Sequence, residues 1–404
     1  MTIELDSLKS NNMYNGLPII KVIGVGGGGG NVVNRMIKDN VKGVVYIAMN
    51  TDAMALNSSG ADVTIPLGNT MTRGLGAGMN PEIGKAAAEA EVEVIQDVLK
   101  GSDMVFLAAG MGGGTGTGAI PVVAEIAKEM EILTVAVVTT PFSFEGKRRA
   151  QIGEAGLLEL RKHVDTLVTI PNTRLLELAS EKTTMTEAFA MADDVLKQAI
   201  SGITNLVNLE GVINLDFADL KTVMEDKGGA LMGTGVGRGE NRGLEAVKKA
   251  INSPLINRPI AGATGVIINI VADEAYPLLD AEAAAIFVQE SAHEDADVIF
   301  GLVYDQSLSD EVSVTVIATG FEKSFKEKSN HRFGKGPLRV TDSMKYQVNP
   351  QMRIKNTSVE KRVAEIVSEK PKPAPQKPET KPQEKPADSV EEIELPHFMR
   401  HRSD

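Results

Sequence analysis

Short, almost wholly apolar runs alternate with longer amphipathic stretches along most of the chain, from Leu17 to about Phe321. Such runs are typical of strands buried on both faces, and the stretches between them space their apolar residues as helices do. This order predicts an α/β fold whose parallel sheet is covered by helices on both faces, with right-handed crossovers. Strands are expected at Ile19–Val25, Val44–Met49, Met104–Ala109, Leu133–Val138 and Thr166–Ile170, and helices at Pro81–Leu99, Ala119–Glu129 and Arg148–Lys162.

A long helical register follows, from Met185 to Leu209, in which apolar residues recur at intervals of three and four. Beyond it the alternation of strand-like and helical patterns resumes. We therefore expect one α/β domain over residues 17–184, a central helix over 185–210 and a smaller α/β domain over 211–321. The strands of the smaller domain are expected at Leu231–Val236, Val266–Val271, Val298–Val303 and Val312–Ala318, and its helices at Arg242–Ile251 and Leu278–Glu290.

The two ends of the chain differ from this body. Residues 322–388 are charged, rich in proline toward their end and poor in apolar side chains, so we expect a disordered linker. Residues 1–16 are expected to be a disordered extension. Residues 389–404 regain apolar side chains, which favours a peptide that binds a partner, although a frayed tail is the alternative. The candidate contacts of this peptide are Ile393, Leu395, Pro396 and Phe398.

Composition and charge narrow the function classes. The chain has 404 residues, and its net charge of −12 argues against a protein that binds nucleic acid mainly through phosphate contacts. Because cysteine is absent, disulfides, thiolate zinc sites and cysteine nucleophiles are excluded, and the five histidines lack metal-ligand spacing. The sequence has no signal-peptide pattern and no stretch of the roughly 20 apolar residues that a membrane helix needs. We expect a soluble, cytoplasmic protein without direct membrane insertion.

A run of glycines follows the first expected strand, in Gly24–Asn31, and a helix is expected from Val32. Glycine lets the backbone approach a ligand closely, and successive N–H groups at a helix start favour an anion. Gly24, Gly26 and Gly29 also satisfy the dinucleotide fingerprint, with Asp52 at about the place of its acidic residue. If this run were only a tight turn without a ligand, ordering so many glycines would cost much backbone entropy with no compensating interaction.

A second glycine loop, Gly110–Gly118, follows the expected strand Met104–Ala109 and contains two threonines. Two anion cradles at neighbouring strand ends suit a compact di- or triphosphate better than a dinucleotide. The P-loop pattern is absent, because Gly146-Lys147 is followed by Arg148 and has no upstream glycine. The sequence therefore predicts a nucleotide-binding protein outside the P-loop class.

Six short motifs then follow one another in the order of a known family. They are Gly24–Asn31, Asn50–Asp52, Gly74–Pro81, Gly112–Gly118, Pro141–Gly146 and Asn214–Asp219. Together they resemble the FtsZ family of bacterial cell-division proteins, in the tubulin superfamily, and Glu394–Arg400 is similar to that family's C-terminal peptide. The resemblance implies a tubulin-type, Rossmann-like GTP-binding domain, a central helix and a C-terminal activation domain. It also implies a GTPase that polymerises head to tail into the cytokinetic ring at midcell.

The resemblance also assigns roles to individual residues. It implies that Glu145 binds the ribose hydroxyls, that Arg149 reaches the nucleotide and that Asn172 makes a further contact. The alternatives are a solvated ion pair between Glu145 and Arg149 and a helix-capping role for Asn172. The residues implied to hold the phosphates of GTP or GDP are Gly27, Gly28, Gly29, Gly30, Asn31, Gly114, Thr115, Gly116, Thr117 and Gly118.

Guanine requires a group that accepts hydrogen bonds from N1–H and the exocyclic amine, and a carboxylate does so. Asp193 matches the family position for this task. Asp194 leaves an ambiguity of one residue, because the two side chains point about 100° apart on a helix.

Helix length bears on catalysis. A helix from Met185 to Leu209 is long, so Asp216 and Asp219 beyond its end cannot readily reach the nucleotide of their own chain. They can reach that of a neighbour stacked head to tail, and in the family this loop polarises the attacking water of the next subunit. Alternatively, Asp219 caps a helix at Leu220–Asp226.

The resemblance further implies Mg²⁺, held mostly by phosphate oxygens and water with no metal-ligand residue assigned. It implies self-association, and membrane-tethering and regulatory division proteins that bind the C-terminal peptide. Three rival functions stay open: a tubulin-like filament for plasmid positioning or cell shape, an NAD-dependent oxidoreductase, and a filament that does not hydrolyse GTP.

Overall fold

The computed structural model describes residues 18–180, 182–208, 216–256, 258–305 and 308–321. The expected N-terminal extension, the linker and the C-terminal peptide lie outside the described residues, as do Asn214 and Leu215 of the sixth motif.

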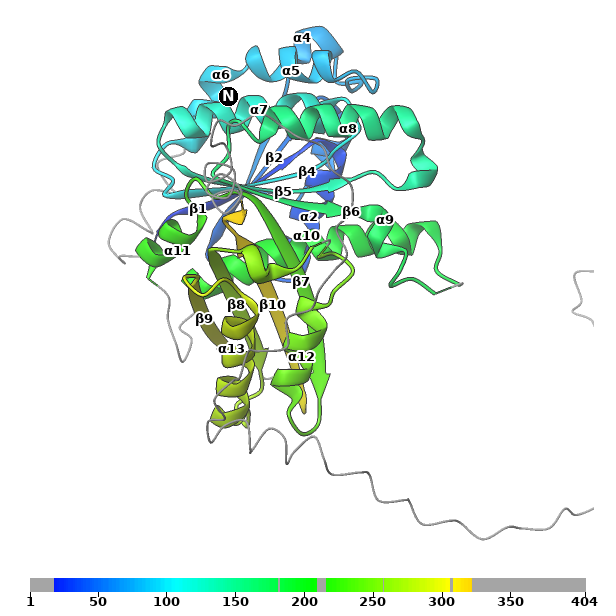
Figure 1. The fold of residues 1–404 in the computed structure, drawn as a ribbon. Helices are drawn as coiled ribbons and strands as arrows, with labels where there is room; N and C mark the ends of the chain where they lie inside the picture. Colours follow the sequence, from blue (N-terminus) through cyan, green and yellow to red (C-terminus); the bar gives the residue numbers. More distant parts are fainter. Residues whose placement is uncertain (1–17, 181, 209–215, 257, 306–307, 322–404) are drawn as a thin grey trace, which may run out of the picture. The chain divides into compact units, whose positions relative to one another are not determined.

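The strands of the described residues form one sheet in the order β3-β2-β1-β4-β5-β6-β7-β10-β8-β9 (Figure 1). Strands β1 to β6 pair in parallel, as the apolar runs predict. Strand β10 runs antiparallel to both β7 and β8. The strand bounds are β1 Ile20–Val25, β2 Val44–Asn50, β3 Val63–Pro66, β4 Met104–Gly110, β5 Leu133–Thr140, β6 Thr166–Pro171, β7 Gly228–Arg238, β8 Gly265–Ala272, β9 Asp297–Tyr304 and β10 Glu311–Thr319.

Strand β7 makes the sheet continuous between the two expected domains. It pairs in parallel with β6 at Thr166–Val168 and along its length with β10. The two α/β patterns in the sequence therefore share one sheet. The short strand β3 was not expected, because four residues carry too little periodicity to stand out.

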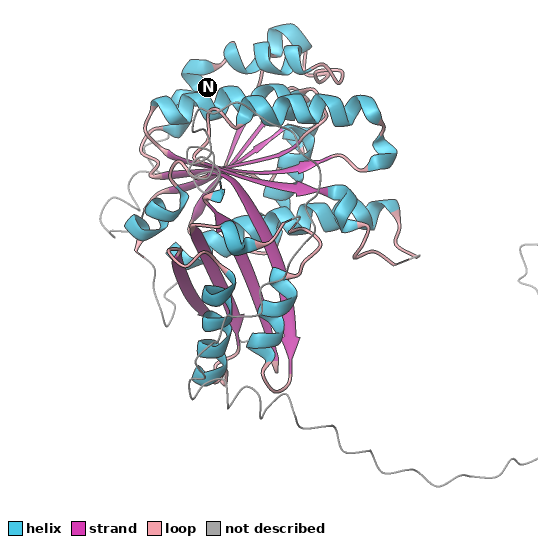
Figure 2. Ribbon diagram, in the orientation of Figure 1, coloured by secondary structure: helices cyan, strands magenta, loops and turns pink. Residues whose placement is uncertain are grey.

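Helices cover both faces of the parallel strands (Figure 2). Their bounds are α2 Gly26–Lys38, α3 Ala53–Asn57, α4 Asn69–Thr72, α5 Pro81–Glu89, α6 Val92–Leu99, α7 Thr115–Glu129, α8 Lys147–Leu160, α9 Asn172–Leu175, α10 Met185–Asn208, α11 Phe217–Met224, α12 Arg242–Ile251 and α13 Leu278–Ser291, with 3₁₀ turns η1 Ser143–Glu145 and η2 Ile260–Gly262.

The helix expected at Pro81–Leu99 is two helices, α5 and α6. The two segments bury side chains of different size. Helix α5 buries Gly84, Ala87 and Ala88, whereas α6 buries Ile95, Val98 and Leu99. Small residues allow α5 to lie close to α7, and the larger side chains of α6 fill space over the sheet.

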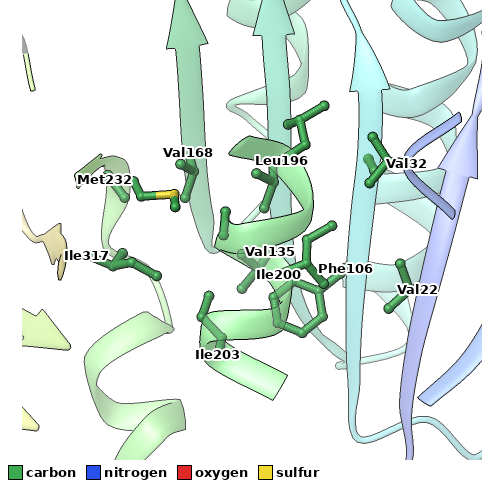
Figure 3. Close-up of a cluster of buried hydrophobic side chains, with 14 of the residues drawn as sticks. Val22, Val32, Phe106, Val135, Val168, Leu196, Ile200, Ile203, Met232 and Ile317 are labelled. Carbon is green, nitrogen blue, oxygen red and sulfur yellow. The ribbon is translucent and has the colours of Figure 1, made fainter. Parts of the chain in front are cut away.

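Helix α10 packs lengthwise on the sheet (Figure 3). Its side chains Leu196, Ile200 and Ile203 are buried in one cluster with side chains of the parallel strands and of β7 and β10. The strand partners labelled in Figure 3 are Val22, Phe106, Val135, Val168, Met232 and Ile317. A shift of α10 along its axis would therefore disturb both parts of the sheet, because packed cores do not deform continuously.

Among the described residues, no helix is both long enough and apolar enough to cross a lipid bilayer.

Candidate functional site

The first glycine run lies inside a helix. Helix α2 begins at Gly26, so the expected loop before a helix at Val32 is wrong. Strand β1 ends at Val25 and passes directly into the helix, whose N-cap makes no side-chain hydrogen bond. The first N–H groups of a helix have no intrahelical acceptor, so those of α2 remain free for an anion.

The glycines of this run serve two purposes. A Cβ atom on Gly29 would lie 2.2 Å from the carbonyl oxygen of Ala108, and one on Gly24 would lie 2.3 Å from the carbonyl oxygen of Gly29. These glycines allow α2 to approach the sheet. A Cβ atom on Gly27 or Gly30 would meet no atom within 4 Å. Open space at these two positions is where a bound group can contact the backbone.

The glycine run at the start of α2 is the first anion cradle, and the loop Gly110–Gly118 is the second. The second cradle is built in the same way as the first. Helix α7 begins at Thr115, so the second half of the Gly110–Gly118 loop forms its first turn. A Cβ atom on Gly114 would lie 2.9 Å from the backbone nitrogen of Asn80, whereas one on Gly113 would face open space. The motif Gly74–Pro81 therefore packs against this turn at Gly114.

Both threonine hydroxyls of the second cradle have partners within the protein. Thr117 Oγ1 accepts a hydrogen bond from the Gly112 N–H at 2.8 Å. Thr115 Oγ1 lies 2.6 Å from Thr51 Oγ1. Thr51 was missed as an individual site residue, although it lies within the second motif. A hydroxyl that accepts one hydrogen bond can still donate one, so the contact of Thr115 and Thr117 with phosphate stays a prediction beside that of the backbone N–H groups.

The two cradles lie side by side. Strands β1 and β4 are neighbours in the sheet, and α2 and α7 start at their carboxyl ends. A Cβ atom on Gly26 would lie 2.8 Å from the backbone nitrogen of Gly116, and one on Gly28 would lie 3.0 Å from that of Gly110. Two helix starts that converge so closely form a single site for a group with several negative charges.

Glu145 and Arg149 form an ion pair, but the pair is not fully solvated. The Glu145 side chain is only 11% exposed, and its Oε1 accepts a hydrogen bond from the Phe142 N–H at 2.9 Å. The carboxylate thereby holds the turn that connects β5 to α8. The structure bears out the pairing of the two side chains, and their contact with a nucleotide stays a prediction.

An aromatic cluster joins this turn to the start of α10. The Phe142 and Phe144 rings stack at 5.0 Å, and Phe189 meets Phe142 edge-on at 5.4 Å. Phe144 and Phe189 are both more than 40% exposed. The sequence pattern counted Phe189 with the apolar stripe of the helix, and its place beside the Phe142–Phe144 pair required the tertiary structure.

The structure distinguishes Asp193 from Asp194. Asp194 forms a bidentate ion pair with Arg35 of α2, with contacts of 2.6 and 2.7 Å. Among the described residues, Asp193 has no such partner. Burial raises the pKa of Asp193 to about 6, an effect that the charge of Asp194 adds to and that of Arg35 opposes. Asp193 lies one helical turn after Phe189, so it is the carboxylate left available beside the aromatic cluster.

Asn172 is the first residue of α9, directly after β6. It is buried, and its Oδ1 has no hydrogen-bond partner in the described part of the chain. The side chain therefore does not cap α9, whose N-cap residue is Pro171. An unpaired buried oxygen is costly unless a ligand supplies a donor.

Comparisons with known proteins identify this arrangement. The model of the tubulin/FtsZ family GTPase domain matches residues 19–180, and that of the FtsZ family C-terminal domain matches residues 228–322. An empty FtsZ dimer from M. jannaschii is similar at 41% identity and a TM-score of 0.74, over 80% of this chain and 94% of that one. The chain belongs to the tubulin/FtsZ family.

A protein of lower identity shares the fold. CetZ2 from Haloferax volcanii, solved as a GTPγS-bound protofilament, is 20% identical with a TM-score of 0.62, over 78% of this chain and 99% of that one. Members of the tubulin/FtsZ family are GTPases, so this chain is a GTPase whose GTPase domain lies at residues 19–180.

The dinucleotide interpretation fails at Asp52. Its carboxylate caps α3 by accepting hydrogen bonds from the N–H groups of Met54 at 2.8 Å and Ala55 at 3.3 Å. In this chain the acidic residue at this distance from the glycines therefore caps a helix, and sequence spacing alone could not distinguish that role from ribose binding.

Asp216 and Asp219 lie apart from the other predicted site residues. Helix α10 spans Met185–Asn208, and from Asp193 to its last residue it rises about 22 Å at 1.5 Å per residue, which separates Asp193 from these two carboxylates (Figure 1). Helix α11 begins at Phe217, so the helix expected from Leu220 starts three residues earlier, with Asp216 at its N-cap and Asp219 in its first turn. Both side chains are exposed, and Asp216 makes no capping hydrogen bond.

Proposed function

We propose that this protein is a filament-forming GTPase whose subunits stack head to tail, with GTP hydrolysed at the junction between them. The observation that carries the proposal is the length of α10 between Asp193 and the exposed pair Asp216 and Asp219. Two carboxylates without a substrate in their own chain can act on that of a neighbour. A contact between two different surfaces of identical subunits repeats without closing and yields a filament.

The nucleotide is assigned to the converging helix starts. Its phosphates bind the free N–H groups at the starts of α2 and α7. The Asp193 carboxylate accepts from guanine, and Asn172 Oδ1 gains the donor that it lacks. Glu145 and Arg149 contact the ribose and the nucleotide while keeping their mutual ion pair. The adjacent Asp216 and Asp219 of the next subunit orient the attacking water.

Mg²⁺ accompanies the nucleotide in this proposal. No group of three or more metal-binding side chains occurs among the residues that the structure describes. Hard cations of this kind keep several waters and bind through substrate phosphates, so the ion requires no protein cage. When bound, it supplies positive charge to the phosphate oxygens.

Exposed apolar side chains support stacking through unlike surfaces. Met54 and Leu75, in the segments that follow β2 and β3, are 81% and 84% exposed. Leu278 and Leu279, at the start of α13, are 80% and 76% exposed. Two apolar patches on different elements suit a contact in which one subunit's first patch meets its neighbour's second. The similar M. jannaschii FtsZ was solved as a dimer.

Turnover measured against protein concentration tests the shared site. GTP hydrolysis per subunit should rise with concentration, in step with the sedimentable fraction, because a lone subunit lacks the second half of its site. Constant turnover by dilute, non-sedimenting protein would refute the mechanism. The Asp219→Ala variant should bind GTP like the parent, assemble and hydrolyse slowly.

The division ring is the proposed setting of the filament. Its support is the higher identity to FtsZ than to CetZ2, 41% against 20%. A fluorescent fusion should form a ring at midcell, and depletion should give long undivided cells. A normal division rate after depletion would favour a filament for cell shape or plasmid positioning.

The C-terminal peptide is proposed to bind division proteins that tether the filament to the membrane. Its candidate contacts, Ile393, Leu395, Pro396 and Phe398, lie outside the described residues. Deleting residues 393–404 should leave GTP turnover and sedimentation unchanged and abolish capture of such an adaptor. Adaptor capture by the truncated chain would mean that the peptide is a frayed end.

A further inference from the structure

Helix α8 packs closely against the second cradle at two of its glycines. A Cβ atom on Gly156 would lie 2.3 Å from Thr117 Cγ2 and 2.8 Å from Met111 Cε. One on Gly153 would lie 3.3 Å from the backbone nitrogen of Gly112. A side chain at Gly156 therefore cannot coexist with the present position of Thr117, since real Cβ contacts do not approach so closely.

The Thr117 side chain is in turn tied to the cradle. It is 3% exposed, and its hydroxyl accepts the buried Gly112 N–H at 2.8 Å. Gly112 has a φ of +100°, and a Cβ atom there would lie 2.5 Å from Pro141 Cγ. The turn out of β4 thus has a backbone conformation that few residues adopt, and the Thr117 hydroxyl is the partner of its N–H group.

A groove of about 400 Å³ borders the same residues on the outer side of α7. It is lined by residues of α5, α7 and α8, among them Thr117, Gly118 and Gly156. A Thr117 side chain displaced by a larger residue at Gly156 has space to turn toward this groove. The displacement would break the hydroxyl bond to Gly112 without forcing α8 off the sheet.

We propose that Gly156 and Thr117 form a positioning pair for the phosphate-binding turn Gly112–Gly118. Gly156 leaves room for the Thr117 methyl group, and the Thr117 hydroxyl then fixes the Gly112 N–H and the shape of the turn. Gly156 has no side chain, and the role assigned to Thr117 is exerted through the backbone of the turn. The inference rests on the proposed nucleotide site.

Four variants of the full chain separate the hydroxyl from the packing. Gly156→Ala introduces the clash, and Thr117→Ala removes both the hydroxyl and the methyl group. Each of the double variants Gly156→Ala/Thr117→Ser and Gly156→Ala/Thr117→Ala relieves the clash with Thr117, because neither keeps Cγ2, and both retain the contact with the flexible end of Met111. Only the serine variant also keeps the hydroxyl, so the two doubles form a matched pair.

The readouts are the equilibrium dissociation constant of GTP, measured with dilute protein, and steady-state turnover. Gly156→Ala, Thr117→Ala and the double with alanine should each weaken GTP binding about tenfold, as expected for a buried N–H left unpaired. The double with serine should bind within about threefold of the parent. In steady-state turnover, the increase in KM should be larger than any change in kcat, because the turn holds the phosphates both before and during the reaction.

Equal GTP affinity in the two double variants would overturn the positioning role of the hydroxyl, and so would parental affinity in Gly156→Ala. The Gly27→Asp variant distinguishes this failure from failure of the proposed site. Its carboxylate would occupy the open space of the first cradle and repel phosphate. If Gly27→Asp binds GTP like the parent, the nucleotide site is misassigned; if it does not bind while Gly156→Ala does, only the positioning pair is wrong.

Discussion

Acidification should weaken GTP binding through Asp193. Burial raises the pKa of this carboxyl to about 6, so it gains a proton in a range where most carboxyls stay ionised. A carboxylate accepts the two N–H groups of guanine, whereas a protonated carboxyl offers one donor in their place. GTP should therefore bind the ionised form preferentially, and binding should release the proton when the pH lies near 6.

The size of the effect follows from the ionised fraction. With a pKa of about 6, Asp193 is ionised in roughly 97% of molecules at pH 7.5 and in roughly a quarter at pH 5.5. The affinity for GTP should thus fall about fourfold between these values. The stability of the folded chain should change with pH in the opposite direction to GTP affinity. Because the folded-state pKa lies above the unfolded value, the folded chain is favoured by the proton, and stability should decline as pH rises from about 4 to about 6.

The assay is GTP binding by dilute protein across this pH range, for the parent and for Asp193→Asn. The terminal phosphate of GTP also titrates near pH 6, so the variant supplies the baseline that contains only that contribution. The ratio of the two dissociation constants should change about fourfold. A ratio that stays constant from pH 7.5 to 5.5 would refute guanine recognition by an ionised Asp193.

Three further outcomes are expected. Gly27→Ala should raise the unfolding free energy by about 0.4–1 kcal/mol yet weaken GTP binding. Gly29→Ala, whose Cβ would lie 2.2 Å from a carbonyl oxygen, should lower the unfolding free energy by about 1–3 kcal/mol. Thermal unfolding without nucleotide checks both variants, and equal midpoints would contradict the assignment. Mixing Asp219→Ala with Gly27→Asp should restore turnover above either alone, because some junctions join an intact cradle to an intact Asp219; no gain at any ratio would count against a shared site. Asp194→Asn should lower the thermal midpoint by breaking an ion pair and Asp193→Asn should not, and the reverse order would mean that the two carboxylates exchange roles.

Local patterns in the sequence were enough to predict most elements. The strands β1, β2, β4, β5 and β6 lie within a residue or two of their apolar runs, and α10 begins at Met185 as expected. These elements are regular because one repeated environment, the buried sheet or one face of a helix, selects side chains along their whole length. The glycine run was equally conspicuous, and its anion-binding chemistry follows from composition and position alone.

The tertiary structure decided what each glycine and each carboxylate does. Gly27 and Gly29 are indistinguishable in the sequence, yet one faces open space and the other lies against Ala108. Asp193 and Asp194 differ because Arg35, 159 residues from Asp194, pairs with only one of them. Such contacts join elements that are remote along the chain, so no periodicity within either element records them. Sequence therefore determined the elements and the kind of ligand, and packing between remote elements determined which atoms are left free to bind it.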